Sequence, residues 1–394
     1  MAITNKEEGV WSIDQVFAKQ NKGSIWEYST NLYELWAWGS NVYGQLGQNE
    51  SEGVPDGGTF YSSPVQIPGT SWSRISNGER TAGALKNDGT MWLWGMNQYG
   101  QLGHNNKTKY SSPVQVPGTS WSKLSNGRFM AMAIRTDGTL WTWGRNHMGQ
   151  LGQNNKTEYS SPRQIPGSWT DCTCNSYSMC GLRSDGTMWS WGYNGNGQLG
   201  QGPTQGTNKF SSPVQIPGSD YKFWPSQAQG MYTNWFSRGS DSDELWGVGR
   251  GNKGQLGNGS NDNFNPSPIQ VPGSWANVAG GYWAHTIGVR TNGTLWSWGY
   301  NEHGQLAQNN RTDRNSPVQI GSGTDWSDIG GGQAGGYATK TDGTLWAWGY
   351  NNQGQLGQNN KTSYSSPVQI PGTTWHTVSG ELESSGQCFA LKQV

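Results

Sequence analysis

The sequence predicts an all-β fold, a seven-bladed β-propeller that is closed by pairing of its N- and C-terminal strands. Three observations support this fold: a sevenfold repeat, strand and turn signals in every repeat, and one repeat that is divided between the chain ends. The motif Gly-Gln-Leu-Gly occurs seven times, with Ala as the last residue of the sixth copy, at spacings of 48 to 57 residues. The copies begin at Gly44, Gly100, Gly149, Gly197, Gly254, Gly304 and Gly354. A period of about 50 residues is typical of one propeller blade.

Each repeat has the pattern of short strands joined by turns. In one unit, residues 131–135 and 140–143 are expected to form two strands joined by an Asp-Gly turn, which is a strong hairpin signal. Trp141 and Trp143 are two residues apart and therefore lie on one face of their strand. The later segment Ser-Pro-Val-Gln-Ile-Pro is expected to be an edge strand, because proline cannot donate to an inner ladder. No helical period is present in the repeat.

The two chain ends together complete one repeat. Residues 388–394 match the first strand of the hairpin, and the chain stops where the turn is expected. The missing partner strand is found at residues 32–39. One blade is therefore expected to contain both termini, which leaves no open sheet edge between the first and last units. This places the propeller at residues 32–394, preceded by an N-terminal extension over residues 1–31.

Composition and charge exclude several classes of function. The chain has 26 basic and 26 acidic residues, so its formal net charge gives no reason to bind nucleic acid or an anionic membrane. No segment approaches the ~20 apolar residues that a membrane helix needs. The start MAITNKEEGVW lacks the apolar centre of a signal peptide, so we expect synthesis and folding in a cytoplasm. The 24 tryptophans are expected to supply the core.

The sequence offers no catalytic or metal-binding pattern. Cys172, Cys174 and Cys180 lack the paired spacing of a zinc site, and we expect them and Cys388 to be buried or half-buried thiols. The five histidines are scattered, and no catalytic or phosphate-binding motif is present. The acidic run at residues 241–244 lacks the glycine and distal glutamate of a calcium loop. We therefore expect a protein that is not an enzyme and that has no cofactor and no metal site.

The repeat resembles a known family. The pattern Asp-Gly-Thr-Leu-Trp-x-Trp-Gly-x-Asn-x-x-Gly-Gln-Leu-Gly, followed by Ser-Pro-Val-Gln-Ile, is similar to the regulator of chromosome condensation repeat over roughly residues 32–394. The resemblance implies a seven-bladed propeller. The eukaryotic founding member of that family is a nucleotide-exchange factor for a small GTPase and binds chromatin through a basic tail. This chain has no such tail, and its loops are near-copies of one another, which disfavours exchange activity.

Function is expected where the repeat is interrupted. Residues 48–61 lengthen one loop, and residues 201–238 contain an irregular, aromatic-rich unit in which Trp-Gly-Val-Gly replaces Trp-x-Trp-Gly. Aromatic rings in such a segment are candidates for contact with a protein or a carbohydrate. The candidate partner-binding residues are Tyr221, Trp224, Tyr232 and Trp235. The alternative is a degenerate blade that is repacked by different aromatic residues.

The N-terminal extension is the third departure from the repeat. Apolar residues at positions 10, 13, 16 and 17 indicate a short amphipathic helix, which is either a strap across the propeller or an anchor to a larger assembly. Residues 9–26 also resemble a segment near the start of virion structural proteins of aquatic tailed phages. This resemblance implies Trp11, Val16 and Trp26 as candidate docking residues.

Together these features favour a non-enzymatic interaction or display module. The leading hypothesis is a bacteriophage virion surface protein, such as a head decoration, fibre or tail adhesin. It would dock on capsid or tail proteins through its N-terminus, present the propeller to a host glycan or protein, and be made in the host cytoplasm. The alternatives are a soluble bacterial propeller that binds or inhibits a protein partner, in the cytoplasm or secreted, and a free lectin. No nucleic-acid partner and no membrane insertion are expected.

Overall fold

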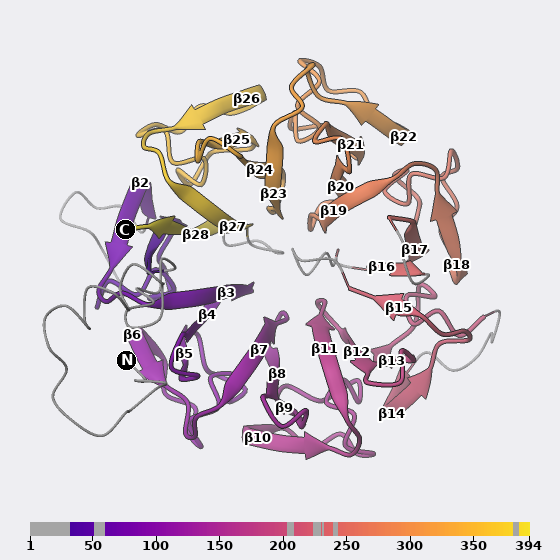
Figure 1. Ribbon diagram of the computed structural model, residues 1–394. Helices are drawn as coiled ribbons and strands as arrows, with labels where there is room; N and C mark the ends of the chain where they lie inside the picture. The colour runs from indigo at the N-terminus through magenta and orange to yellow at the C-terminus, as the bar shows by residue number, and fades with distance from the viewer. Residues whose placement is uncertain are drawn as a thin grey trace, which may run out of the picture.

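Seven four-stranded antiparallel sheets surround a central axis in the computed structural model (Figure 1). The structure describes residues 32–50, 60–202, 209–223, 230, 232–238, 243–380 and 386–394. These residues contain no helix, and thus no helix that could cross a membrane. The strands are β1 (Tyr33–Ser40), β2 (Phe60–Ile67), β3 (Trp72–Gly78), β4 (Thr81–Lys86), β5 (Met91–Gly95), β6 (Tyr110–Gln115), β7 (Trp121–Asn126), β8 (Met130–Arg135), β9 (Leu140–Gly144), β10 (Tyr159–Ile165), β11 (Trp169–Cys174), β12 (Ser178–Arg183), β13 (Met188–Tyr193), β14 (Lys209–Gln215), β15 (Tyr221–Lys222), β16 (Thr233–Arg238), β17 (Leu245–Gly249), β18 (Asn265–Val271), β19 (Trp275–Gly280), β20 (His285–Arg290), β21 (Leu295–Gly299), β22 (Arg314–Gln319), β23 (Trp326–Gly331), β24 (Gly335–Lys340), β25 (Leu345–Gly349), β26 (Tyr364–Ile370), β27 (Trp375–Gly380) and β28 (Gln387–Gln393).

The strand order within each blade follows the sequence. The sheet β3-β4-β5-β6 is typical: β3 is innermost, and β6, which contains Pro113, is the outer edge. The outer strands of the other blades contain the corresponding proline. The prediction that these segments are edge strands is confirmed. An edge position tolerates the proline because the ladder on that side is open.

The chain ends close the ring as the sequence predicted. Strand β1 pairs with β28 from Tyr33–Gln393 to Gly39–Gln387, and β28 in turn pairs with β27. In Figure 1 the yellow C-terminal strands lie beside the indigo N-terminal ones. Because one sheet has the order β2-β1-β28-β27, backbone hydrogen bonds join the two ends of the propeller.

The core lies between adjacent blades. Trp143 and Trp121 of one blade pack with Leu85, Met91 and Leu93 of the preceding blade, and Trp143 is completely buried. The Trp143 indole also donates a 2.9 Å hydrogen bond to the Gln101 carbonyl in the loop of that preceding blade. The same inter-blade bond is made by Trp38, Trp94, Trp298 and Trp348. The second tryptophan of Trp-x-Trp-Gly therefore fills the seam between blades, and in these five blades it also bonds across the seam, whereas the Trp191 indole has no such bond.

The first tryptophan of the same motif supports the hairpin tip. The Trp92 indole donates to the Thr90 hydroxyl at 3.0 Å, and this hydroxyl donates to the Asp88 carboxylate at 2.7 Å. The Lys86 ammonium lies over the rings of Trp72 and Trp92, 4.8 Å from each centroid. Every blade places a lysine or arginine between aromatic rings at this point. They are Lys86, Arg135, Arg183, Arg238, Arg290, Lys340 and Lys392.

Candidate functional site

The residues that recur in the loops between the third and fourth strands form hydrogen bonds that stabilise those loops. The Asn97 side chain accepts a hydrogen bond from the Leu102 amide and donates to the Asn106 and Thr108 carbonyls. The Gln101 side chain accepts from the Tyr99 amide at 2.9 Å. Equivalent bonds recur in the loops of other blades. Because these motif residues are buried and most of their polar atoms are bonded within the fold, they have little to offer a partner.

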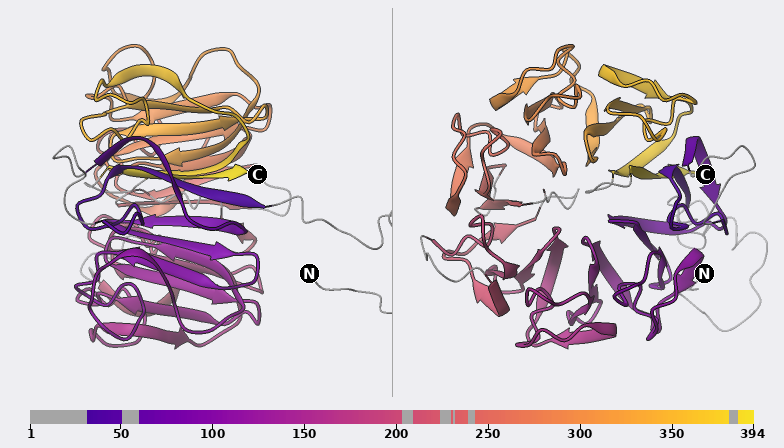
Figure 2. Two further views of the ribbon diagram at one scale, coloured as in Figure 1. Left: turned by 90° about the vertical axis from the view of Figure 1, so that its left-hand side faces the viewer. Right: turned by 180° about the vertical axis from the view of Figure 1, so that it is seen from behind.

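The topology separates two faces of the ring, which Figure 2 shows edge-on. One face carries the Asp-Gly hairpin tips and the connections between blades, which are near-copies of one another. The other face, here called the rim face, carries the loops between the first and second strands and between the third and fourth strands. Most of the loop side chains that differ between repeats lie on this rim face. This face can therefore give each blade a different surface.

Three positions of each blade supply this variation. The first precedes the second strand, the second follows the Trp-x-Trp-Gly motif, and the third precedes Gly-Gln-Leu. The first position holds Arg80, Phe129, Tyr177, Tyr232, Ala284, Ala334 and Gly386. The second holds Ser40, Met96, Arg145, Tyr193, Arg250, Tyr300 and Tyr350. The third holds Tyr43, Tyr99, Met148, Asn196, Lys253, His303 and Gln353. Aromatic and cationic side chains are prominent in this set.

These side chains contact one another around the rim face. Arg145 lies 4.7 Å from the ring centroid of Tyr99, which packs against Phe129. Tyr177 and Tyr232, from adjacent blades, are stacked with centroids 6.0 Å apart. A third cluster joins Trp283, His303 and Tyr350, with centroid distances of 4.7, 5.0 and 6.1 Å. All of these rings except that of Phe129 are partly exposed, so the rim face presents aromatic surface edged with positive charge.

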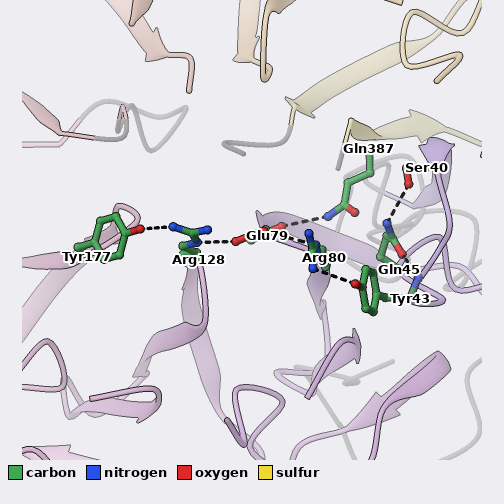
Figure 3. Close-up of polar contacts among 9 residues, drawn as sticks. Ser40, Tyr43, Gln45, Glu79, Arg80, Arg128, Tyr177 and Gln387 are labelled. Carbon is green, nitrogen blue, oxygen red and sulfur yellow. Dashed lines mark hydrogen bonds and ion pairs between the residues drawn. The ribbon is translucent and has the colours of Figure 1, made fainter. Parts of the chain in front are cut away.

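A buried carboxylate holds part of the rim face together. Glu79 has a side chain that is 2% exposed, and it lies between two arginines (Figure 3). Arg128 approaches it at 2.6 Å and Arg80 at 3.3 Å. Arg80 also donates to the Tyr43 hydroxyl at 2.8 Å, and Arg128 bonds the Tyr177 hydroxyl. The network joins loops of four consecutive blades.

The sequence-predicted partner-binding residues are divided by the structure. Tyr221 is 2% exposed and Trp235 is fully buried, so both rings lie in the interior. Tyr232 is partly exposed on the rim face. Trp224 lies outside the described residues, as do the predicted docking residues Trp11, Val16 and Trp26, the expected helix, and most of the long loop at residues 48–61. Docking through the N-terminal extension therefore stays a prediction.

Repacking explains why Trp235 is buried. Val248 stands where other blades have the second tryptophan, and the Trp235 ring packs on the opposite face of the sheet, against Trp275 and Trp298 of the next blade. Trp235 pairs with Gly247, where a Cβ atom would lie 2.3 Å from the Trp235 ring. Asn234 replaces the missing indole donor, because its amide donates to the Gln198 carbonyl of the preceding blade at 2.6 Å. The structure thus agrees with the alternative of a blade repacked by different aromatics.

The sequence also predicted that the four cysteines are buried, and this is confirmed. Burial raises the pKa of Cys180 to about 12 and raises the pKa of the other three thiols as well. A thiol with a raised pKa is a poor nucleophile and a poor metal ligand. Among the described residues no three Cys, His, Asp or Glu side chains cluster as a metal site would require.

A pocket of about 220 Å³ opens on the rim face where the β15–β18 blade meets the β19–β22 blade. Its polar and aromatic side chains come from loops of both blades. They are Tyr232, Arg250, Asn252, Lys253, Tyr282, Trp283 and Tyr300. The floor includes His285, which is 1% exposed and whose ring Nε2 lies 2.9 Å from the Gly335 carbonyl of the next blade. Burial lowers the pKa of His285 to about 4, so its imidazole is neutral at physiological pH.

Sequence reasoning located the irregular blade but missed the four residues that make this pocket distinctive, Arg250, Lys253, Trp283 and Tyr300. One signal was available. The irregular unit is the one repeat that holds a lysine or arginine at both the second and third variable positions. That Trp283 and Tyr300 lie beside these cations depends on the contact between two blades, which no single repeat encodes.

Solved structures confirm the fold. Human WBSCR16 is similar with a TM-score of 0.78 and 20% identity, over 92% of this chain and 99% of the other. Yeast RCC1 (Prp20), bound to Kap60, has a TM-score of 0.79 and 16% identity, over 92% of this chain and 89% of the other. Prp20p from Saccharomyces cerevisiae, described with its binding to Gsp1p and histones, has a TM-score of 0.78 and 17% identity, covering 91% of each chain.

The sequence comparisons identify the family. The X-linked retinitis pigmentosa GTPase regulator of Mus musculus is 34% identical over 80 residues, which is 20% of this chain and 8% of that protein. The alignment therefore spans a small part of that relative. The Regulator of chromosome condensation (RCC1) repeat matches seven segments of the chain, at residues 34–85, 88–134, 137–181, 185–227, 242–287, 292–336 and 342–379. These matches cover most of the propeller, and the chain therefore belongs to the RCC1 repeat family.

Proposed function

We propose that this protein is a non-enzymatic interaction module that binds a protein partner through the rim face of its propeller. The observation that supports this proposal is that recurring and variable residues of the repeat have different structural roles. Recurring residues are engaged in hydrogen bonds and inter-blade packing, while the variable positions place partly exposed aromatic and cationic side chains on one face. Aromatic residues and arginine are the side chains enriched in protein–protein interfaces.

The family supports the same class of function. Prp20p is described with its binding to Gsp1p and histones, and it has also been solved bound to Kap60. At 16–17% identity these structures establish a shared fold, and protein binding by this chain is part of the proposal. A rigid ring suits such a role because its loops need little ordering when they bind. The proposal concerns binding alone and includes no nucleotide exchange. Display on a virion stays a prediction.

A random peptide library displayed on beads tests the proposal even while the partner is unidentified. Peptides are selected on the full chain and then measured against two variants. The rim variant combines Tyr99→Asn with Tyr350→Ser, and each new residue is one that another repeat holds at the same position. The control combines Thr119→Lys with Thr373→Lys, two exposed turn positions on the opposite face.

We expect most selected peptides to lose affinity for the rim variant and to keep it for the control, although the control adds two charges. The proposal would be contradicted if the selected peptides kept their affinity for the rim variant but lost affinity for the opposite-face variant. A parallel glycan array distinguishes the lectin alternative. Binding of neutral glycans at the rim with no rim-dependent peptide would favour a lectin instead.

A further inference from the structure

The rim-face pocket between the β15–β18 and β19–β22 blades has the features of a site for one side chain of a partner. Its volume of about 220 Å³ is below the roughly 300–1,000 Å³ typical of pockets that enclose a drug-sized ligand. Trp283 and Tyr300 stand in its wall and are partly exposed. A pocket of this size and lining suits a single inserted group flanked by apolar contacts.

The electrostatics of the pocket favour an anion. Among the described residues, Arg250 and Lys253 are the charged side chains in its lining, and no carboxylate lines it. Both cations lie over aromatic rings: Arg250 is 5.7 Å from the Tyr232 centroid, and Lys253 is 4.7 Å from that of Tyr300. Within the described part of the chain neither cation forms an ion pair with a carboxylate. The Glu302 carboxylate, beside the pocket, is bonded to the Tyr300 hydroxyl. Arg80 and Arg128 differ, because both are paired with Glu79.

The pocket is also held in shape by the neighbouring blade. The Trp283 amide donates to the Gln333 carbonyl at 3.0 Å, and the Tyr282 amide donates to the Gly332 carbonyl at 3.3 Å. Together with the contact between His285 and Gly335, these bonds fix the loop that carries Trp283. The outer side of the Trp283 ring packs against His303. A wall fixed before binding lowers the entropy that a ligand must overcome.

We infer that this pocket receives the carboxylate of an aspartate or glutamate side chain from an acidic segment of a protein partner, with an adjacent aromatic or aliphatic residue resting on Trp283 and Tyr300. The inference rests on the proposed function and names the partner chemistry at one part of the rim face. Arg250 can meet a carboxylate with two parallel donors, whereas Lys253 acts as a point charge. A free phosphate or sulfate ion has no adjacent apolar group to cover the two rings.

The repeat itself supplies variants that are expected to fold. Tyr193, Tyr300 and Tyr350 stand in other blades at the position of Arg250, and Gln353 stands at that of Lys253. Arg250→Tyr and Lys253→Gln therefore remove the charges by substituting residues that these loop positions accept elsewhere. Arg163→Val is the matched control, because it removes one exposed arginine on the outer strand β10, away from the rim face, and substitutes the valine that five other blades hold there.

The probes are fluorescein-labelled hexapeptides in which one central Glu is flanked by Phe, Tyr or Leu, together with identical peptides that contain Gln. Fluorescence anisotropy with the full chain is expected to show at least tenfold tighter binding of the Glu peptides, an advantage that shrinks at 1 M salt, where the screening length is only about 3 Å. Arg250→Tyr and Lys253→Gln should each weaken Glu binding by about tenfold, and Arg163→Val by no more than about twofold.

Equal binding of Glu and Gln peptides, absence of Glu-peptide binding, or equal losses in Arg250→Tyr and Arg163→Val would each overturn the inference. If 3′-sialyllactose bound to the pocket and none of the peptides did, the pocket would be assigned to acidic glycans and the inference would also be overturned. The two proposals fail separately. If library peptides depend on Tyr99 and Tyr350 but not on Arg250, the rim function stands and the acidic pocket is wrong.

Discussion

Phenylalanine in place of Trp94 should destabilise the propeller more than the same change at Trp38, although both rings are fully buried at equivalent positions. Each indole N–H donates across a blade seam, from Trp94 to the Gln45 carbonyl at 2.8 Å and from Trp38 to the Gln355 carbonyl at 2.7 Å. The Gln355 carbonyl has a second donor, the Tyr337 hydroxyl at 2.8 Å. Among the described residues the Gln45 carbonyl has none.

The magnitude follows from this difference. Both substitutions lose similar packing, and that loss largely cancels when the two variants are compared. Trp94→Phe leaves a buried carbonyl without a donor, which costs about 1–3 kcal/mol, whereas Trp38→Phe leaves the carbonyl paired with Tyr337. Trp94→Phe should therefore have a free energy of unfolding lower than that of Trp38→Phe by about 1–3 kcal/mol. Tyr337→Phe should then cost more in the Trp38→Phe background than in the natural sequence.

Urea denaturation followed by far-ultraviolet circular dichroism gives these free energies, and the four proteins of the Trp38–Tyr337 set form a double-mutant cycle. The cycle also removes the separate contribution of Tyr337 to its other contacts. Equal stabilities of Trp94→Phe and Trp38→Phe, or a coupling between Trp38 and Tyr337 below about 0.5 kcal/mol, would refute the reasoning that the shared carbonyl decides the cost.

Three further predictions concern the hairpin tips, the irregular blade and the thiols. Hydrogen bonds from Thr90, Thr139, Thr187 and Thr344 lower the pKa values of Asp88, Asp137, Asp185 and Asp342. The ionised carboxylates stabilise the folded state above the ordinary pKa near 3.8, and this contribution is lost as the pH falls through the lowered folded-state pKa values. Tm should therefore drop between about pH 4 and pH 2, and the fourfold Asp→Asn variant should show a smaller drop. Gly247→Ala should lower the free energy of unfolding by about 1–3 kcal/mol, because the new Cβ lies 2.3 Å from the Trp235 ring, and urea denaturation that shows no loss would mean that the ring can move aside. The buried thiols Cys172, Cys174, Cys180 and Cys388 should resist a thiol-specific reagent at about pH 8 in the folded protein and all react in denaturant, and rapid reaction of the native protein would contradict their burial.

Much of the fold could be predicted because its signals are local and repeated. Proline at an edge strand, Asp-Gly at a two-residue turn and alternating tryptophans are each readable within a few residues. The closure at β1 and β28 was also predictable, because an incomplete repeat at one end matched its missing strand at the other. The irregular blade could be recognised from the loss of Trp-x-Trp-Gly, although the compensation by Asn234 could not.

The candidate site was less predictable for a physical reason. The exposure of an aromatic side chain depends on the blade beside it, whose residues are about 50 positions away along the chain. Tyr221 and Trp235 were candidates for partner contact and are buried, because Tyr221 takes the place of the buried tryptophan that opens the other blades and Trp235 fills the space above Gly247. Trp283 drew no attention in the sequence, yet its loop is fixed to the next blade at a pocket mouth.

The sequence by itself determined the number of blades, the order of strands and the joining of the chain ends, since each is written in a repeated local pattern. Only the tertiary structure decided which variable side chains meet. Arg250 and Lys253 come from one blade and Trp283 and Tyr300 from the next, and they line a common pocket because the seam between these blades brings their loops together. Burial and charge at such a seam arise from both blades at once, and therefore neither repeat alone could reveal the pocket.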